Sequence, residues 1–137
     1  MERIIKLVLF VALISGGAVF AETSTAQQAP NVPTTPAIII PKLTQDQCIK
    51  TFNVGFEKLF LLTEIAISSN NYTVEQIQSD GGYIVFSVNR YRFLATVMSF
   101  SSSQAILKIS PCDGNYAFPS IIIKNIFKNI ETNQFKK

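Results

Sequence analysis

The spacing of hydrophobic residues changes twice along this chain, and these changes divide it into helical and extended segments. Between residues 44 and 68, apolar residues recur at intervals of three and four, which is typical of one face of an α-helix. From residue 72 to residue 110 they mostly alternate with other residues, as in strands that bury one face. From residue 119 the helical interval returns. The pattern predicts a helix, a run of strands and a second helix.

The first predicted helix starts at Thr44, with Gln47 three residues later completing a capping box. It is expected to end near residues 68–71, which favour caps and turns. Its apolar face consists of Ile49, Phe52, Phe56, Leu59, Phe60 and Thr63. Pro119 suits the first position of the second helix. The apolar stripe of that helix consists of Ile122, Ile123, Ile126, Phe127 and Ile130.

Four strands are predicted between the helices. In the first of them Val74 and Ile77 have opposite parity, which indicates a bulge or an edge position. Asn89-Arg90 has the position of a two-residue hairpin loop, so Val88 and Tyr91 should pair and share a face. The strands are expected at residues 72–78, 83–88, 91–100 and 104–110.

Hairpin parity sorts the strand side chains into two faces. One face is apolar throughout and consists of Ile84, Phe86, Val88, Tyr91, Phe93, Ala95 and Val97. The other face is mixed, and its candidate partner surface consists of Tyr83, Val85, Arg92, Leu94, Met98 and Phe100. The helices should cover the apolar face, because Arg92 and Lys108 on the mixed face would be costly to bury unpaired. The predicted fold class is α+β: a four-stranded antiparallel meander with an N-terminal and a C-terminal helix packed on one face, in the order α-β-β-β-β-α.

The N-terminus has the three parts of an export signal. Arg3 and Lys6 give a basic start, residues 7–14 are an unbroken apolar run, and Val19 and Ala21 fit a cleavage site. We therefore expect cleavage after Ala21, which leaves no stable membrane anchor and a secreted or periplasmic protein.

The rest of the chain divides into a tether and a domain. Residues 1–21 are the predicted signal peptide, and residues 22–43 are rich in Pro, Thr and Gln, which predicts a tether. Residues 44–137 have the length and patterning of a single α+β domain.

Two cysteines, Cys48 and Cys112, follow the predicted signal peptide. In an oxidising compartment an even number of cysteines predicts a disulfide between them. The alternative is two separate buried thiols, since free cysteine is often buried. A zinc site is not expected, because zinc takes four ligands of the Cys and His type and the chain has no histidine.

Composition restricts the chemistry further. Without histidine, Ser-His and Cys-His nucleophile pairs are excluded. The net charge of +3 falls to +2 without the signal peptide, and this balance predicts no nucleic-acid binding. Gly81-Gly82 lies between antiparallel strands and lacks the pattern of a phosphate loop. We expect no catalytic, cofactor-binding or metal-binding residues, and no enzyme activity.

Two functions from different classes fit this outline. The first is a non-catalytic interaction or assembly module of the cell envelope or secreted space, which binds a protein partner or itself through a sheet face or edge. The alternative is a small carrier that binds an apolar ligand between helix and sheet. A pocket of that carrier would be lined by the five phenylalanines Phe52, Phe56, Phe60, Phe86 and Phe93.

Overall fold

The computed structural model describes residues 36–136. The predicted signal peptide and most of the predicted tether lie outside these residues. The chain divides into two compact units, Met1–Ile38 and Ile39–Lys137. Of the first unit only residues 36–38 are described, and they have no regular secondary structure. All helices and strands of the described part belong to the second unit.

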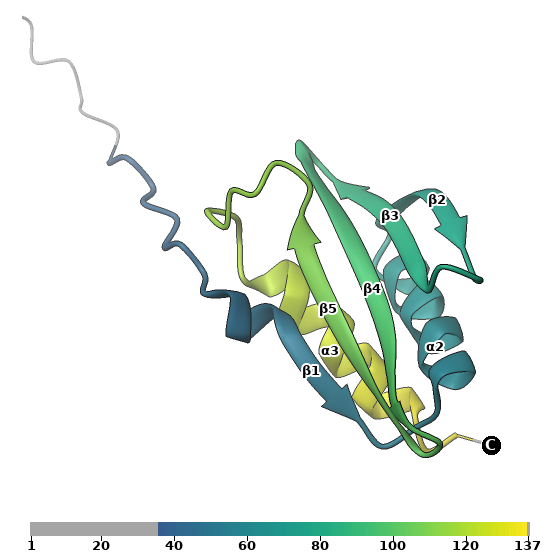
Figure 1. The fold of residues 1–137 in the computed structure, drawn as a ribbon. Coiled ribbons are helices and arrows are strands. Elements are labelled where there is room, and N and C mark those ends of the chain that lie inside the picture. The colour runs from purple at the N-terminus through teal and green to yellow at the C-terminus, as the bar shows by residue number, and fades with distance from the viewer. Residues whose placement is uncertain (1–35, 137) are drawn as a thin grey trace, which may run out of the picture. The chain divides into compact units, whose positions relative to one another are not determined.

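Five strands of this unit form one antiparallel sheet in the order β1-β5-β4-β3-β2 (Figure 1). In chain order the elements are the 3-10 helix η1 (Gln45–Cys48), β1 (Ile49–Phe52), α2 (Phe56–Ser69), β2 (Thr73–Gln78), β3 (Tyr83–Val88), β4 (Tyr91–Ser101), β5 (Gln104–Pro111) and α3 (Ile121–Asn133). Strands β2 to β5 are a meander, and β1 lies on the outer side of β5. The α+β class is as predicted, but the sheet has five strands instead of four.

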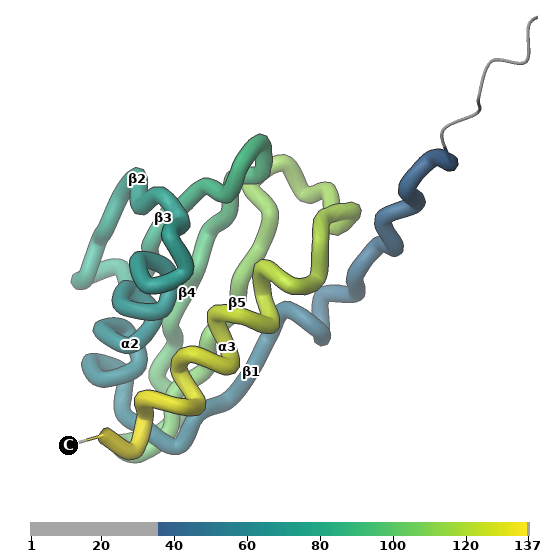
Figure 2. Tube along the Cα trace, turned by 180° about the vertical axis from the view of Figure 1, so that it is seen from behind, coloured from purple at the N-terminus to yellow at the C-terminus, as the bar shows by residue number. Residues whose placement is uncertain are grey.

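Both helices lie on the same side of the sheet, as the view from behind shows (Figure 2). The side chains beneath them are the apolar face that hairpin parity predicts, and Phe86, Phe93 and Ala95 are fully buried there. From the helices, Leu59 and Ile126 are fully buried against this face. Neither helix of residues 36–136 combines the length and the hydropathy that a bilayer-spanning helix requires.

The prediction of a helix that starts at Thr44 was wrong. The capping box is present, and Gln47 Oε1 accepts a hydrogen bond from the Thr44 backbone N–H at 2.9 Å, but it starts only the single turn of η1. The chain then extends as β1, and α2 begins at Phe56. Pairing with β5 satisfies backbone groups of Ile49–Phe52 and leaves Phe52 only 3% exposed. Phe52 is thus buried in a strand and not on the apolar face of a helix.

Two local predictions in the sheet are confirmed. Val88 pairs with Tyr91, so the loop between β3 and β4 has two residues, and Asn89 has the positive φ of 53° that such turns require. In β2 the register shifts between Val74 and Gln76, which is the predicted bulge, and β2 is an edge strand. A bulge on an edge strand disrupts the ladder locally and hinders pairing with another chain.

The predicted disulfide is absent: the thiols of Cys48 and Cys112 are both free. The register of the sheet explains why. Ile49 pairs with Lys108, so Cys48 is level with Ile109, three residues before Cys112 along β5. Three residues of a strand span about 10 Å, which exceeds the Cα separation of about 7 Å that a disulfide tolerates. Cys48 is also buried among core residues, whereas Cys112 is exposed.

A thiol reagent will distinguish the two cysteines. We expect one thiol per native chain, Cys112, to react rapidly with a chromogenic disulfide, and Cys48 to react only after unfolding, because Cys48 is 1% exposed. Partial desolvation of the Cys112 sulfur raises the pKa of its thiol although the residue is exposed, so the reaction should accelerate until the pH lies above the ordinary cysteine range. Two rapid thiols, or none, in the native chain would contradict this arrangement.

Candidate interaction surface

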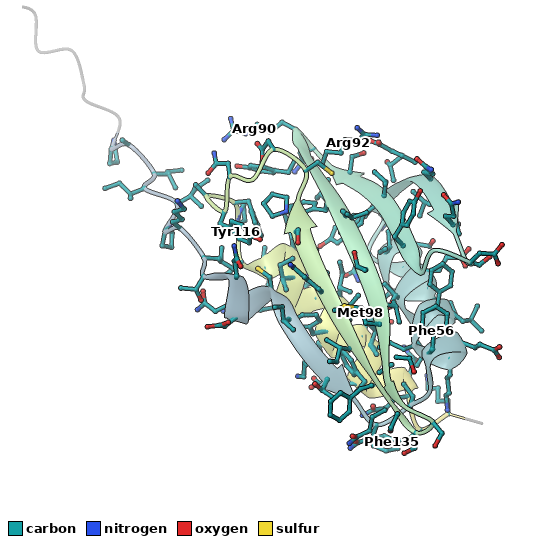
Figure 3. All side chains as sticks on the ribbon, in the orientation of Figure 1. Phe56, Arg90, Arg92, Met98, Tyr116 and Phe135 are labelled. Atoms are coloured by element: carbon teal, nitrogen blue, oxygen red, sulfur yellow. The ribbon has the colours of Figure 1, made fainter. Side chains whose placement is uncertain are left out.

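The strand register places the predicted partner surface on the face of the sheet that the helices do not cover. Tyr83 lies opposite Thr96, and Val85 lies opposite Leu94. These positions alternate with the buried residues beneath the helices, so their side chains point to the other side. Figure 3 shows this side in the same view as Figure 1, with Met98 labelled over the central strands. We call this side the open face; it consists of Tyr83, Val85, Arg92, Leu94, Thr96, Met98, Ile106 and Lys108.

Exposure varies along the open face. Val85 is only 8% exposed, whereas Tyr83 and Leu94 are half-buried. Arg92 is exposed, and Met98 is 40% exposed. The apolar side chains of this face are therefore most accessible near the end of β4.

Phe100 lies at this end of β4 and is 67% exposed. The sequence places Phe100 on the same face as Met98 by strict alternation. In the structure the register of β4 and β5 shifts between Ser99 and Ser101, so alternation ends there and does not fix the direction of Phe100. Phe100 is therefore exposed apolar surface at the end of β4 that is not assigned to the open face.

Two apolar neighbours were not predicted as part of this surface. Ile106 lies opposite Met98 and is half-buried, and Ile49 lies opposite Lys108 and is 38% exposed. Ile106 is two residues before Lys108 in β5, so the alternation of the strand is enough to assign Ile106 to the same face as Lys108. Ile49 was assigned to a helix face, and only the β1–β5 pairing reveals its position.

An ion pair lies at the other end of the open face. The Arg92 guanidinium donates a hydrogen bond from Nε to Glu75 Oε2 of β2 at 2.5 Å. The Arg92 hydrogen bond lowers the pKa of the Glu75 carboxyl below its ordinary value. Lys108 forms no ion pair with any other residue between 36 and 136. Arg92 and Glu75 thus lie away from Met98, whereas Lys108 lies opposite Thr96, next to the pair formed by Met98 and Ile106.

The ion pair makes a prediction about pH. In Arg92→Gln the pKa of Glu75 should rise toward its ordinary value, because the hydrogen bond that stabilises the carboxylate is lost. In the unchanged chain the small stabilisation from the pair is complete at neutral pH and is lost as the pH falls through the lowered pKa. NMR titration of the Glu75 carboxyl carbon in both proteins measures the difference. An identical midpoint in the two proteins would show that the pair does not form in solution.

The phenylalanines of the proposed carrier pocket pack on other aromatic rings. The rings of Phe86 and Phe93 stack with centroids 5.2 Å apart, and Phe56 and Phe60 stack at 6.2 Å. Phe52 meets Phe127 edge to face at 6.0 Å. Phe86 and Phe93 have no exposed surface. These side chains form core contacts between the helices and the sheet.

Chemistry-bearing side chains are scattered in the described part of the chain. Within residues 36–136, no group of three or more Cys, Asp or Glu residues is placed to hold a metal ion. Neither the models of known protein families nor the curated proteins include a match to this chain. By its fold and this surface, the described part of the chain is an α+β domain in which helices cover one face of the sheet and leave the other face open.

Proposed function

We propose that this chain is an exported, non-catalytic interaction or assembly module that docks a protein partner, or a second copy of itself, through the open face. The observation that carries the proposal is the exposure of Met98 (40%), opposite the half-buried Ile106, on a sheet whose other face is buried under helices. Clustered apolar side chains on a surface mark protein interaction sites more often than isolated ones do.

The composition of the open face supports protein docking. Tyr, Met and Arg are enriched in protein interfaces, and the face presents Tyr83, Met98 and Arg92. Arg92 is already held by Glu75, so a partner would meet an oriented guanidinium without paying its full ordering entropy. The bulge in the edge strand β2 makes that edge a poorer docking site than the face.

The export part of the proposal rests on the sequence alone. The basic start, the apolar run of residues 7–14 and the cleavage site at Ala21 favour a secreted or periplasmic protein. Amino-terminal sequencing of the protein from its own host should begin at Glu22. A sequence that begins at Met1 would contradict cleavage.

The core packing argues for the module and against a carrier that binds between helix and sheet. A carrier of that kind needs an apolar cavity beside Phe86 and Phe93, but these rings stack on each other, and Phe93 also contacts Phe118 and Tyr91. Ligand entry there would require the helices to separate from the sheet.

Site-specific photo-crosslinking tests the docking proposal. A photoreactive phenylalanine analogue at Met98 should yield a discrete adduct in the native host, because its side chain lies on the exposed part of the open face. Mass spectrometry of the adduct distinguishes a partner protein, a second copy and a segment of the same chain.

The matched control is the same analogue at Leu61, which is 55% exposed on the outer side of α2. The proposal expects an adduct from Met98 and none from Leu61. Equal adducts from both positions would indicate unspecific contact of apolar residues. An adduct within the chain itself, or no adduct at Met98, would also overturn the proposal.

A further inference from the structure

A groove separate from the open face lies between the segment that enters the domain and helix α3. Its volume is about 390 Å³, near the lower end of the range of ligand pockets. The lining residues come from two short stretches of the chain: Pro41, Lys42, Leu43, Gln47, Ser120, Ile123, Lys124 and Phe127.

Both walls of the groove are fixed by the fold. The Leu43 backbone N–H donates to the Tyr116 carbonyl oxygen at 3.0 Å, and the capping box of η1 holds Gln47. The second wall is one face of α3, because the four lining residues of α3 and its N-cap recur at intervals of three and four: Ser120, Ile123, Lys124 and Phe127. The groove therefore needs no rearrangement of the domain to exist.

The chemistry of the lining is two-sided. The accessible apolar surface of the groove comes from Pro41, which is exposed, and from Phe127, which is half-buried, while Leu43 and Ile123 belong to the core behind it at 9% and 1% exposure. Lys42 and Lys124 are exposed, and neither forms an ion pair within the described residues. By contrast, Lys50, whose ammonium lies 5.8 Å from the centroid of the Phe127 ring, is paired with Glu131. None of the described lining residues is acidic.

We propose that this groove binds a small amphiphilic carboxylate, with its apolar chain against Pro41 and Phe127 and its carboxylate between Lys42 and Lys124. An apolar surface of this size with two free ammonium groups complements a short acyl or aryl chain that ends in one negative charge. The Ser120 N-cap places the positive end of the α3 dipole at the same groove, which adds to the attraction for an anion. This site goes beyond the proposed docking function and does not depend on it.

Octanoate is a direct probe of the proposal. In ¹H–¹⁵N NMR spectra of the full chain, octanoate should shift the backbone amides of Leu43 and of residues 120–124 in a saturable manner. Acetate has the same charge without the chain, and octylammonium has the chain with the opposite charge. Both should leave these amides unshifted at the same concentration. An equal response to acetate would show that the groove attracts any small anion. An equal response to octylammonium would show that it binds any apolar chain. Either result would overturn the proposal.

Charge-neutralising variants test the two lysines. In the double variant Lys42→Gln, Lys124→Gln, octanoate should bind at least about tenfold more weakly, because both ammonium partners of the carboxylate are gone. Lys128→Gln is the matched control, since Lys128 is an exposed lysine one turn further along α3 and does not line this groove. Unchanged affinity in the double variant, or an equal loss in Lys128→Gln, would overturn the assignment. If the double variant does not fold, the comparison of the three probes on the unchanged chain still decides the question.

Discussion

Phe93→Ala is expected to lower the free energy of unfolding by about 3–5 kcal/mol, as truncations of fully buried phenylalanines do. Phe93 has no exposed surface and contacts two other buried rings: it stacks on Phe86 at 5.2 Å and meets Phe118 edge to face at 4.9 Å. The substitution removes both aromatic contacts and leaves a cavity that strands β3 and β5 cannot close without shifting. Urea denaturation followed by circular dichroism measures the loss.

The control is the next residue along β4. Leu94→Ser lies on the open face and should cost only about 1 kcal/mol, because Leu94 is half-buried and has no helix over it. The two substitutions therefore compare opposite faces of one strand. Equal losses from Phe93→Ala and Leu94→Ser would mean that both faces are core in solution, and the docking proposal would have to be abandoned.

Gly82→Ala is expected to be nearly as damaging, for a reason that involves the backbone. Gly82 has a φ of +67°, and this left-handed conformation costs an alanine about 1–2 kcal/mol. A Cβ atom at this position would also lie 2.7 Å from the Val97 carbonyl oxygen and 3.0 Å from the Phe56 ring. The Val97 N–H donates to the Gly82 carbonyl oxygen at 2.7 Å, so the two segments cannot separate without losing that bond. With about 1–3 kcal/mol for overpacking, the expected total loss is about 2–5 kcal/mol.

Gly114→Ala separates the two contributions. Gly114 has a φ of +72°, but a Cβ atom there would meet nothing within 4 Å. The expected loss is therefore only the backbone cost of about 1–2 kcal/mol. Thermal denaturation of both variants gives the comparison. If Gly114→Ala were as destabilising as Gly82→Ala, the close approach of Gly82 to β4 would add nothing to the loss of stability in Gly82→Ala.

The meander could be predicted because its information is local. The dipeptide Asn89-Arg90 fixes the parity of β3 and β4, and parity alone assigns Phe93 to the core and Leu94 to the open face. The bulge of β2 could likewise be inferred from the mismatched parity of Val74 and Ile77. The second helix follows from one apolar stripe, of which Ile126 and its three isoleucine neighbours are buried.

The first strand could not be predicted, because its partner is distant in sequence. Ile49, Phe52 and Phe56 are spaced as on a helix, and Thr44 and Gln47 do form a capping box. The capping box therefore does start a helical turn, but the helix does not continue beyond that single turn. The pairing of β1 with β5 overrides helical spacing through hydrogen bonds and burial that no short window of sequence contains.

The same register explains the wrong disulfide and part of the candidate surface. The predicted helix did not fix the distance between Cys48 and Cys112. In the structure Cys48 lies beside β5, and the register sets the two residues too far apart to bond. Ile49 joins the apolar side chains next to the open face for the same reason. The groove at α3 was missed as well, since residues 41–43 were assigned to a tether although Leu43 packs in the core.

The position of β1 in the sheet sets an order of events during folding. Strands β2 to β5 are joined by short turns, so each is next in sequence to its neighbour in the sheet. β1 is made first but pairs with β5, which follows α2 and three other strands. Contacts between distant segments form late, because the loop between them must close first. Until β5 is available, β1 and the side chain of Phe52 remain without their native partners, so the last part of the sheet to be completed is the edge formed by the first strand of the chain.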